Sequence, residues 1–140
     1  MAEIVRLESV DEKTCSEINE LLHQFNDVAT SVDLLRTMIG SLSSELWTAV
    51  EDRIIVGMAT LVLVVKVGGT SSRIEDVVVH EQYRKRGIGK ALCQKLIERA
   101  RAHGAYSIHL TSRPDRVIAN ELYKKLGFKL HNTNAYRMQL

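Results

Sequence analysis

The chain has 140 residues, of which 45% are hydrophobic, so it can bury one substantial core but is too short to suggest a second domain. We predict a single domain over residues 1–140. The 19 basic and 17 acidic residues nearly cancel, which argues against nucleic acid as a partner because nucleic-acid binders usually carry a strong positive charge.

Cysteine, histidine and hydropathy patterns exclude several other classes. Cys15 and Cys93 are too few for a disulfide framework or a zinc site, and both fall in helical patterns where a buried thiol is expected. We therefore expect a reducing, cytoplasmic setting. The five histidines show no ligand spacing, so no metal site is predicted. The longest apolar run, residues 54–67, is too short to span a bilayer, so no membrane association is expected.

Patterns in the first third of the chain predict a strand followed by two helices. Residues 3–7 alternate polar and apolar side chains, as a strand does. Apolar side chains then recur at helical spacing over residues 11–26 and again after Ser31, a suitable N-cap. The buried stripe of the second helix is predicted to consist of Leu34, Leu35, Met38 and Leu42.

The middle of the chain predicts a meander of strands. Residues 46–51 and 54–67 are two apolar runs joined by a tight polar turn. Gly57 indicates a bulge within the second of these strands. A loop over residues 68–72 then leads to a third strand over residues 73–79.

Helices and strands alternate in the last half. A helix that begins at Gly87 and ends at Gly104 separates the strand of residues 73–79 from one over residues 106–111, so these two strands should be parallel. A last helix runs from Asp115 to Gly127, and residues 128–130 and 136–140 are predicted as edge strands. The fold class is therefore α/β (α+β), a mixed sheet with one βαβ unit and helices on both faces.

The turn before the long helix has the residues of an anion site. Gly87 and Gly89 stand in the first helical turn, where free N–H groups and the macrodipole attract phosphate. The turn also carries four basic residues, Arg84, Lys85, Arg86 and Lys90. This charge favours a di- or polyphosphate ligand. The alternative is a solvated basic turn that binds nothing.

Two blocks resemble one enzyme family. Residues 84–89, Arg-Lys-Arg-Gly-Ile-Gly, resemble the Arg/Gln-x-x-Gly-x-Gly/Ala signature of the GNAT superfamily of N-acetyltransferases. Residues 122–128, Leu-Tyr-Lys-Lys-Leu-Gly-Phe, resemble the Leu-Tyr-x-x-x-Gly-Phe element near the end of the same domains. The two motifs occur in the family's order, and the resemblance covers the chain well from residue 73 onward.

This resemblance implies a GNAT-like, mainly antiparallel central sheet that binds acetyl-CoA. The strands of residues 73–79 and 106–111 would splay apart to admit the pantetheine arm, and the basic turn would hold the pyrophosphate. Many family members have Asn at the position of Arg116, whereas this chain has Asn120 nearby, which either takes that cofactor contact or lies on the helix surface. The implied cofactor-binding residues are Val77, Val78, Val79, Arg84, Lys85, Arg86, Gly87, Ile88, Gly89, Lys90 and Asn120.

The resemblance also implies catalytic groups. Tyr123 corresponds to the general acid that protonates the thiolate of coenzyme A as it leaves; its alternative role is that of a core tyrosine. A base must also remove a proton from the amine. Glu75 and Asp76 precede the three valines, where strand alternation would place one on each face. We select Glu75 as the base, with an ordinary paired carboxylate as the alternative.

A narrower resemblance concerns the acceptor. Residues 73–79 and 136–140 look like the matching parts of glucosamine 6-phosphate N-acetyltransferases, in which the Glu-Asp pair helps to hold the sugar phosphate. The turn of residues 111–114 differs from the acidic turn of those enzymes. An amino sugar is therefore one acceptor among several.

The sequence thus predicts a transferase, an acetyl-CoA-dependent N-acetyltransferase in which a primary amine attacks the thioester directly within a ternary complex. The acceptor is a small molecule of amino sugar, polyamine or amino acid type, or a peptide amine. The alternative is a non-catalytic acyl-CoA-binding sensor domain, although such a domain would not need Tyr123 as an acid. The acceptor's identity and a homodimeric state stay open.

Overall fold

A computed structural model describes all 140 residues and shows two compact units, Met1–Leu110 and Thr111–Leu140. The first unit contains β1 (Glu3–Arg6), α1 (Glu12–Phe25), α2 (Val32–Ile39), β2 (Ser44–Glu51), β3 (Ile54–Lys66), β4 (Gly69–Val79), the 3-10 turn η1 (Glu81–Tyr83), α3 (Ile88–Ala102) and β5 (Ile108–His109). The second unit contains α4 (Val117–Lys125).

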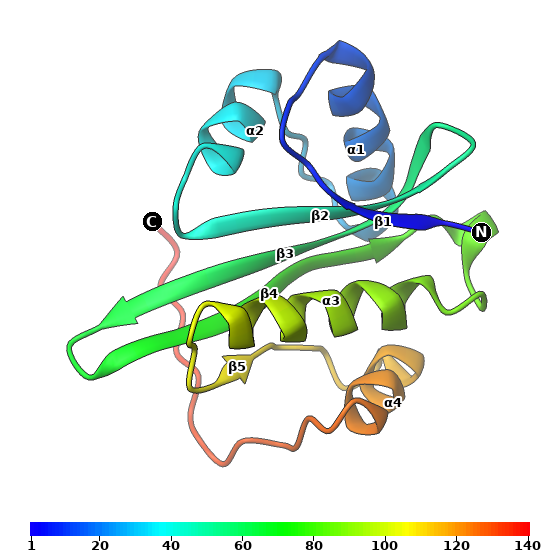
Figure 1. Cartoon of the computed structure of the whole chain (residues 1–140). Helices are drawn as coiled ribbons and strands as arrows, with labels where there is room; N and C mark the ends of the chain where they lie inside the picture. Colours follow the sequence, from blue (N-terminus) through cyan, green and yellow to red (C-terminus); the bar gives the residue numbers. More distant parts are fainter. The chain divides into compact units, whose positions relative to one another are not determined.

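The first unit is built on a five-stranded sheet in the order β1-β2-β3-β4-β5. Neighbouring strands are antiparallel except β4 and β5, which are parallel because α3 connects them. Figure 1 shows α1 and α2 on one face of this sheet and α3 on the other. The predicted fold class, a mixed and mainly antiparallel sheet with a βαβ unit, is confirmed.

The helices α1 and α2 begin at side-chain caps. The Asp11 carboxylate accepts a hydrogen bond from the Thr14 amide at 2.8 Å, and the Ser31 hydroxyl accepts one from the Leu34 amide at 3.1 Å. Each cap satisfies an amide that the first helical turn leaves without a partner. None of the helices combines the length and the apolar character that crossing a membrane would require.

Both helices bury an apolar stripe against the sheet. The core on this face consists of Val10, Cys15, Ile18, Leu21, Leu22, Leu35, Leu46, Ile55, Met58 and Val78. The stripe predicted for α2 is wrong at two positions, because Leu34 is 59% and Leu42 98% exposed. The helix ends at Ile39, before Leu42, and it turns Val32, Leu35 and Ile39 toward the core, so Leu34 faces away.

Gly57 allows α3 to approach β3 closely on the opposite face. A Cβ at this position would lie 3.2 Å from Ile88 Cγ2 and 3.3 Å from Leu92 Cδ1, tighter than ordinary contact. The register between β2 and β3 shifts beside it, between Ala49 and Val50, so the predicted bulge is confirmed. Ile88 and Leu92 are buried, and they fix the first half of α3 on the sheet.

Several strand boundaries differ from those predicted. β4 starts at Gly69, so most of the predicted loop over residues 68–72 is strand, and β5 is only two residues long. Residues 128–130 and 136–140 form no strand, and Tyr136, Met138 and Leu140 are largely exposed. An alternating segment becomes a strand only when another strand pairs with it, and the unit Thr111–Leu140 contains none.

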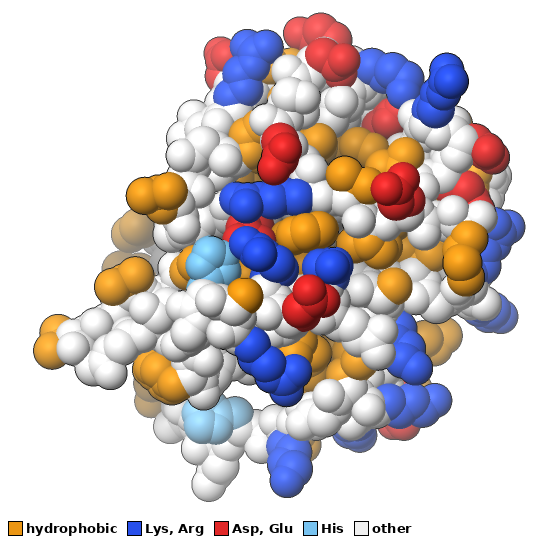
Figure 2. All heavy atoms as spheres, in the orientation of Figure 1, with side chains coloured by type: hydrophobic (Ala, Val, Ile, Leu, Met, Phe, Trp, Pro, Cys, Tyr) orange, Lys and Arg blue, Asp and Glu red, His pale blue; other side chains and the backbone are white.

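A buried carboxylate joins β2 to the C-terminal half of α3. Glu45 is 3% exposed and forms a two-pronged ion pair with Arg99, whose Nε and Nη2 lie 2.9 and 2.8 Å from its two oxygens. His103 Nε2 and Trp47 Nε1 also bond to Glu45, and Arg6 lies 3.8 Å away. Figure 2 shows basic, acidic and histidine side chains gathered over α3 on this face.

These partners lower the pKa of Glu45. The ordinary value of 4.5 falls to about 2, first because of the Arg99 hydrogen bonds and then those of His103 and Trp47, which outweigh the opposing effect of burial. Lys95 and Arg99 lie over the Trp47 ring, at 5.3 and 6.0 Å from its centre. Both oxygens of Glu45 thus have hydrogen-bond partners, and two of these partners, Arg99 and His103, hold the C-terminal end of α3 against β2.

Glu45→Gln should therefore destabilise the protein in a pH-dependent way. The lowered pKa corresponds to about 3 kcal/mol of stability, fully present above pH 4.5 and lost as the pH falls toward 2. We expect the variant to lose about this amount of unfolding free energy at neutral pH and to show a flatter acid limb, as measured by urea denaturation. Glu98→Gln, which breaks an exposed pair with Lys95 and makes no contact with Glu45, is the control and should change stability by less than about 0.5 kcal/mol.

Candidate active site

The N-terminus of α3 is open to an anion. Gly87 is its N-cap with a φ of 80°, and no side chain caps the helix, unlike α1 and α2. Lys85 also has a positive φ, of 65°. The first helical bond runs from the Ala91 amide to the Gly87 carbonyl, so the amides of residues 88–90 have no acceptor within the helix. This geometry suits a phosphate group.

All four basic side chains of the turn are exposed, but two already have partners. Arg84 Nε donates to the Val79 carbonyl at 3.2 Å. Arg86 Nη1 lies 3.4 Å from a Glu51 oxygen, and its guanidinium stacks 4.9 Å from the centre of the Tyr83 ring. The structure thus gathers the predicted basic residues around one turn and holds two of them in fixed directions.

The C-terminal end of α1 supports the same turn. Gln24 Oε1 accepts a hydrogen bond from the Glu81 amide at 2.9 Å, and Glu20 lies 3.4 Å from His80 Nε2. The other nitrogen of His80 accepts from the Gln82 amide. The sequence contains no motif for these contacts, because they join residues about 60 positions apart.

The strands β4 and β5 part early. Their pairing is limited to Ser72 with Ile108 and Arg73 with His109, and β4 continues alone on this side to Val79. Val77 and Val79 are half-buried beyond the pairing, whereas Val78 is buried in the core below α1 and α2. The pairing of β4 with β5 therefore ends well before β4 does, as the resemblance implies, and β4 continues alone to the basic turn.

The strand β4 contains a β-bulge, one residue more than the stretch of β3 that it pairs with. Met58 of β3 pairs with Val78 and Thr60 with Glu75, so two steps along β3 match three steps along β4. Asp76 lies within this bulge and has a φ of 55°. A bulge interrupts the alternation of side chains.

The bulge corrects the expectation that Glu75 and Asp76 lie on opposite faces. Glu75 pairs directly with Thr60 and so shares its face, which is also the face of Met58 in the α1/α2 core. Asp76 reaches the same residue, because Thr60 Oγ1 lies 3.0 Å from Asp76 Oδ2. Both carboxylates therefore point to the side of the sheet that α1 and α2 cover.

The two carboxylates have different surroundings. Glu75 Oε1 lies 3.0 Å from Arg73 Nε, in a partly exposed ion pair. Asp76 is accessible to solvent, but its pKa is raised above the ordinary value, mainly by loss of hydration and also by the Glu75 charge, while the Thr60 hydrogen bond opposes this. A carboxylate with a raised pKa is a better proton acceptor.

The unit Thr111–Leu140 carries the remaining predicted residues on α4. Tyr123 is buried, and its ring meets Phe128 edge-on with 6.1 Å between the centres. Asn120 donates from its amide nitrogen to the carbonyls of Arg113 and Arg116, both at 2.8 Å, so its N–H groups hold the loop before the helix. Gly127, with a φ of 103°, ends α4 as predicted.

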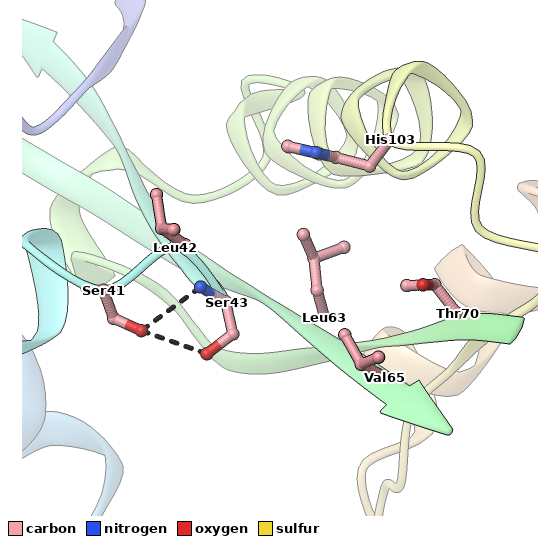
Figure 3. Close-up of a pocket in the computed structure, with 7 residues that line it drawn as sticks. All are labelled: Ser41, Leu42, Ser43, Leu63, Val65, Thr70 and His103. Atoms are coloured by element: carbon pink, nitrogen blue, oxygen red, sulfur yellow. Dashed lines mark hydrogen bonds between the residues drawn. The ribbon is translucent and has the colours of Figure 1, made fainter. Parts of the chain in front are cut away.

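A separate hollow of about 400 Å³ lies at the other end of α3. Figure 3 shows His103 at one side, Leu63 and Val65 of β3 below it, and Ser41 bonded to Ser43. A helix of fifteen residues separates this hollow from the basic turn, and its lining is mostly apolar. It is therefore distinct from the candidate anion site.

The sequence and the structure were compared with known proteins. Residues 13–128 match the acetyltransferase (GNAT) family. A glucosamine 6-phosphate N-acetyltransferase of Trypanosoma brucei brucei is 41% identical over 80 residues, which are 55% of this chain and 52% of that protein. The chain thus spans about half the length of this curated relative.

Solved structures resemble the whole chain. An acetyltransferase of Trypanosoma brucei has 30% sequence identity and a TM-score of 0.85, with all of both chains covered. A glucosamine-6-phosphate N-acetyltransferase of Arabidopsis thaliana has 19% identity and a TM-score of 0.81, covering 99% of this chain and 98% of that one. The second likeness concerns the fold alone.

Gly87→Ala tests the turn. An alanine at a φ of 80° costs about 1–2 kcal/mol, so we expect a lower melting temperature and at least about tenfold weaker binding of coenzyme A by calorimetry. Gly68→Ala is the matched control, because its surroundings are open and its φ is not positive, and it should leave both unchanged. Undiminished affinity in Gly87→Ala would argue against a role of this turn in binding.

Proposed function

Because the chain belongs to the acetyltransferase (GNAT) family, we propose that it is an enzyme, a single domain over residues 1–140, that transfers the acetyl group of acetyl-CoA to a primary amine. The observation that carries this proposal is the uncapped start of α3 at Gly87, which lies at the end of the splayed strand β4. The buried, unpaired thiols of Cys15 and Cys93 are compatible with the cytoplasm as its location.

The donor is proposed to bind along β4 and the basic turn. The amides of Ile88, Gly89 and Lys90 and the side chains of Arg84, Lys85, Arg86 and Lys90 would face the pyrophosphate. Ile88 would contribute only its backbone, because its side chain is buried against β3. Backbone groups of Val77 and Val79 would face the pantetheine arm, and Asn120 Oδ1 could accept a further hydrogen bond.

The reaction proposed is direct transfer. The neutral amine attacks the thioester carbonyl, a tetrahedral oxyanion forms, and the thiolate of coenzyme A leaves with a proton from Tyr123. A carboxylate of the Glu75 and Asp76 pair takes the proton that the amine must lose. The pair lies on the face covered by α1 and α2, so the acceptor would bind on that face.

An amino sugar phosphate is the acceptor class we favour. The support is the 41% identity to a protein named as a glucosamine 6-phosphate N-acetyltransferase, together with two carboxylates on one face that would attract an ammonium group. Polyamines, amino acids and peptide amines are the competing acceptors. A homodimer is compatible with these features but none of them requires it.

A non-catalytic acyl-CoA-binding domain is the alternative function. It would use the same basic turn but would need neither a buried tyrosine on α4 nor a carboxylate with a raised pKa. Both groups are present. They favour the enzyme.

The deciding experiment measures thiol release from acetyl-CoA against a panel of acceptors. The panel contains glucosamine 6-phosphate, unphosphorylated glucosamine, polyamines, amino acids and peptides. Turnover with the sugar phosphate at the highest kcat/KM would support the proposal. Tight binding of acetyl-CoA with no turnover on any acceptor would favour the sensor domain.

Tyr123→Phe separates catalysis from binding. We expect kcat to fall by about 10²-fold or more, because the leaving thiolate loses its acid, with little change in the affinity for acetyl-CoA. The loss should shrink with an acyl donor whose leaving group is a weaker base. An equal loss of turnover and affinity would indicate that the tyrosine serves the core instead.

A further inference from the structure

We propose that Asp76, rather than Glu75, takes the proton from the acceptor ammonium, and that Thr60 is the positioning residue that holds it for this step. The inference rests on the acetyl transfer proposed above. The ammonium N–H bond breaks, its proton passes to Asp76 Oδ1, and the nitrogen keeps the electron pair with which it attacks the thioester carbonyl. The protonated carboxyl then returns its proton to solvent.

The bulge in β4 aims Asp76 at the acceptor side. In a regular strand Asp76 would point to the face opposite Glu75. The extra residue and the φ of 55° bring its carboxylate to Thr60 on the α1/α2 face. Asp76 also lies where β4 has already parted from β5, beyond the last paired residue, Arg73.

Glu75 is less available to the substrate because it already has a partner. Its Oε1 forms an ion pair with Arg73 Nε at 3.0 Å. Its negative charge instead acts on Asp76, where it favours the protonated form. Glu75 therefore tunes the base and attracts the ammonium group.

Thr60 positions the Asp76 carboxylate through one hydrogen bond from a neutral hydroxyl. It is 2% exposed, and its hydroxyl donates to Asp76 Oδ2 at 3.0 Å, which leaves Oδ1 for the substrate. A neutral hydroxyl positions the carboxylate without adding a charge that would suppress proton uptake. The partner of Glu75, in contrast, is a cation, the Arg73 guanidinium.

The charged groups that approach β4 from neighbouring elements include several with partners elsewhere. On α1, Glu17 binds Lys13 and the Ile55 amide, and Glu20 faces His80. On β5, His109 Nε2 lies 3.0 Å from the Ser107 hydroxyl. The charged groups of α3 lie on the opposite face of the sheet, and on β3 the only one is Lys66, at the far end over Tyr106. Glu75 is thus the charge that acts on Asp76.

Two variants should move the acid limb of kcat/KM in opposite directions. Thr60→Val removes a hydrogen bond that lowers the pKa of Asp76, so the limb should shift to higher pH. Glu75→Gln removes a charge that raises this pKa, so the limb should shift to lower pH. Asp76→Asn should reduce kcat by about 10²-fold or more. All variants are measured with the same acceptor, so the ionisation of the acceptor itself is common to every profile.

Thr48→Val is the matched control. Thr48 is also a 2% exposed threonine of the sheet with a hydroxyl donated to a neighbouring strand, at 3.0 Å to the Val5 carbonyl, but it has no contact with a carboxylate. The Thr48→Val variant should lose some stability but leave the acid limb of kcat/KM at its wild-type pH. A Thr60→Val effect that merely reflected loosened packing would resemble this control.

The outcomes separate this inference from the proposed function. If the wild-type protein turns over and Asp76→Asn keeps its activity, the role of Asp76 is overturned while the acetyltransferase function stands. The same holds if activity is lost chiefly in Glu75→Gln. Unshifted limbs in Thr60→Val and Glu75→Gln would overturn it as well. No turnover by the wild-type protein on any acceptor, with coenzyme A bound, would overturn both.

Discussion

The strand β4 pairs with β3 on one side and with β5 on the other, and its extra residue at Asp76 lies where only the β3 side is still paired. Along β3 the pairing resumes after the bulge and brings Val78 into the core below α1 and α2. Along β5 the pairing stops at Arg73, so the backbone beyond it is left for another partner. The sheet therefore continues through the bulge on the β3 side, whereas on the β5 side it ends before the bulge is reached.

The open side of β4 is useful only if the basic turn that follows is held in place. Two contacts at opposite ends of α3 do this. Near its start, Ile88 and Leu92 lie against Gly57, where a Cβ would make tighter than ordinary contact with both. Near its end, Arg99 is locked to the buried Glu45. The helix can then present an uncapped N-terminus to solvent, although such an end stabilises a helix less than a capped one.

Local chemistry made much of this predictable from sequence. Glycines at the two ends of α3, the capping residue before α2, and the helix between two apolar strands each have one dominant structural interpretation. The same signals located the basic turn, whereas the tyrosine of α4 was identified through the resemblance of residues 122–128 to a family motif. Gly57 was identified as a bulge because a glycine inside an apolar strand has few other uses.

The remaining features depend on contacts between distant residues. The bulge at Asp76 has no glycine to mark it, and alternation alone placed Glu75 and Asp76 on opposite faces. Glu45 reads as an ordinary polar residue at the start of a strand, because its partners Arg99 and His103 follow more than 50 positions later. The alternating segment at residues 136–140 predicted a strand, but alternation describes one face of a pair and cannot supply the other strand.

Glu45 and Asp76 are both carboxylates, but their surroundings shift their pKa values in opposite directions. Glu45 is more deeply buried, yet its pKa falls because Arg99, His103 and the Trp47 indole all form hydrogen bonds to it. The pKa of Asp76 rises, mainly through loss of hydration and also through the Glu75 charge, and its one neutral donor, Thr60, only partly opposes this. A site selected for stability alone would exchange Glu75 for a cation, as Arg99 serves Glu45. The presence of a carboxylate with a single neutral donor in a left-handed bulge is therefore the feature on which the proposed proton transfer rests.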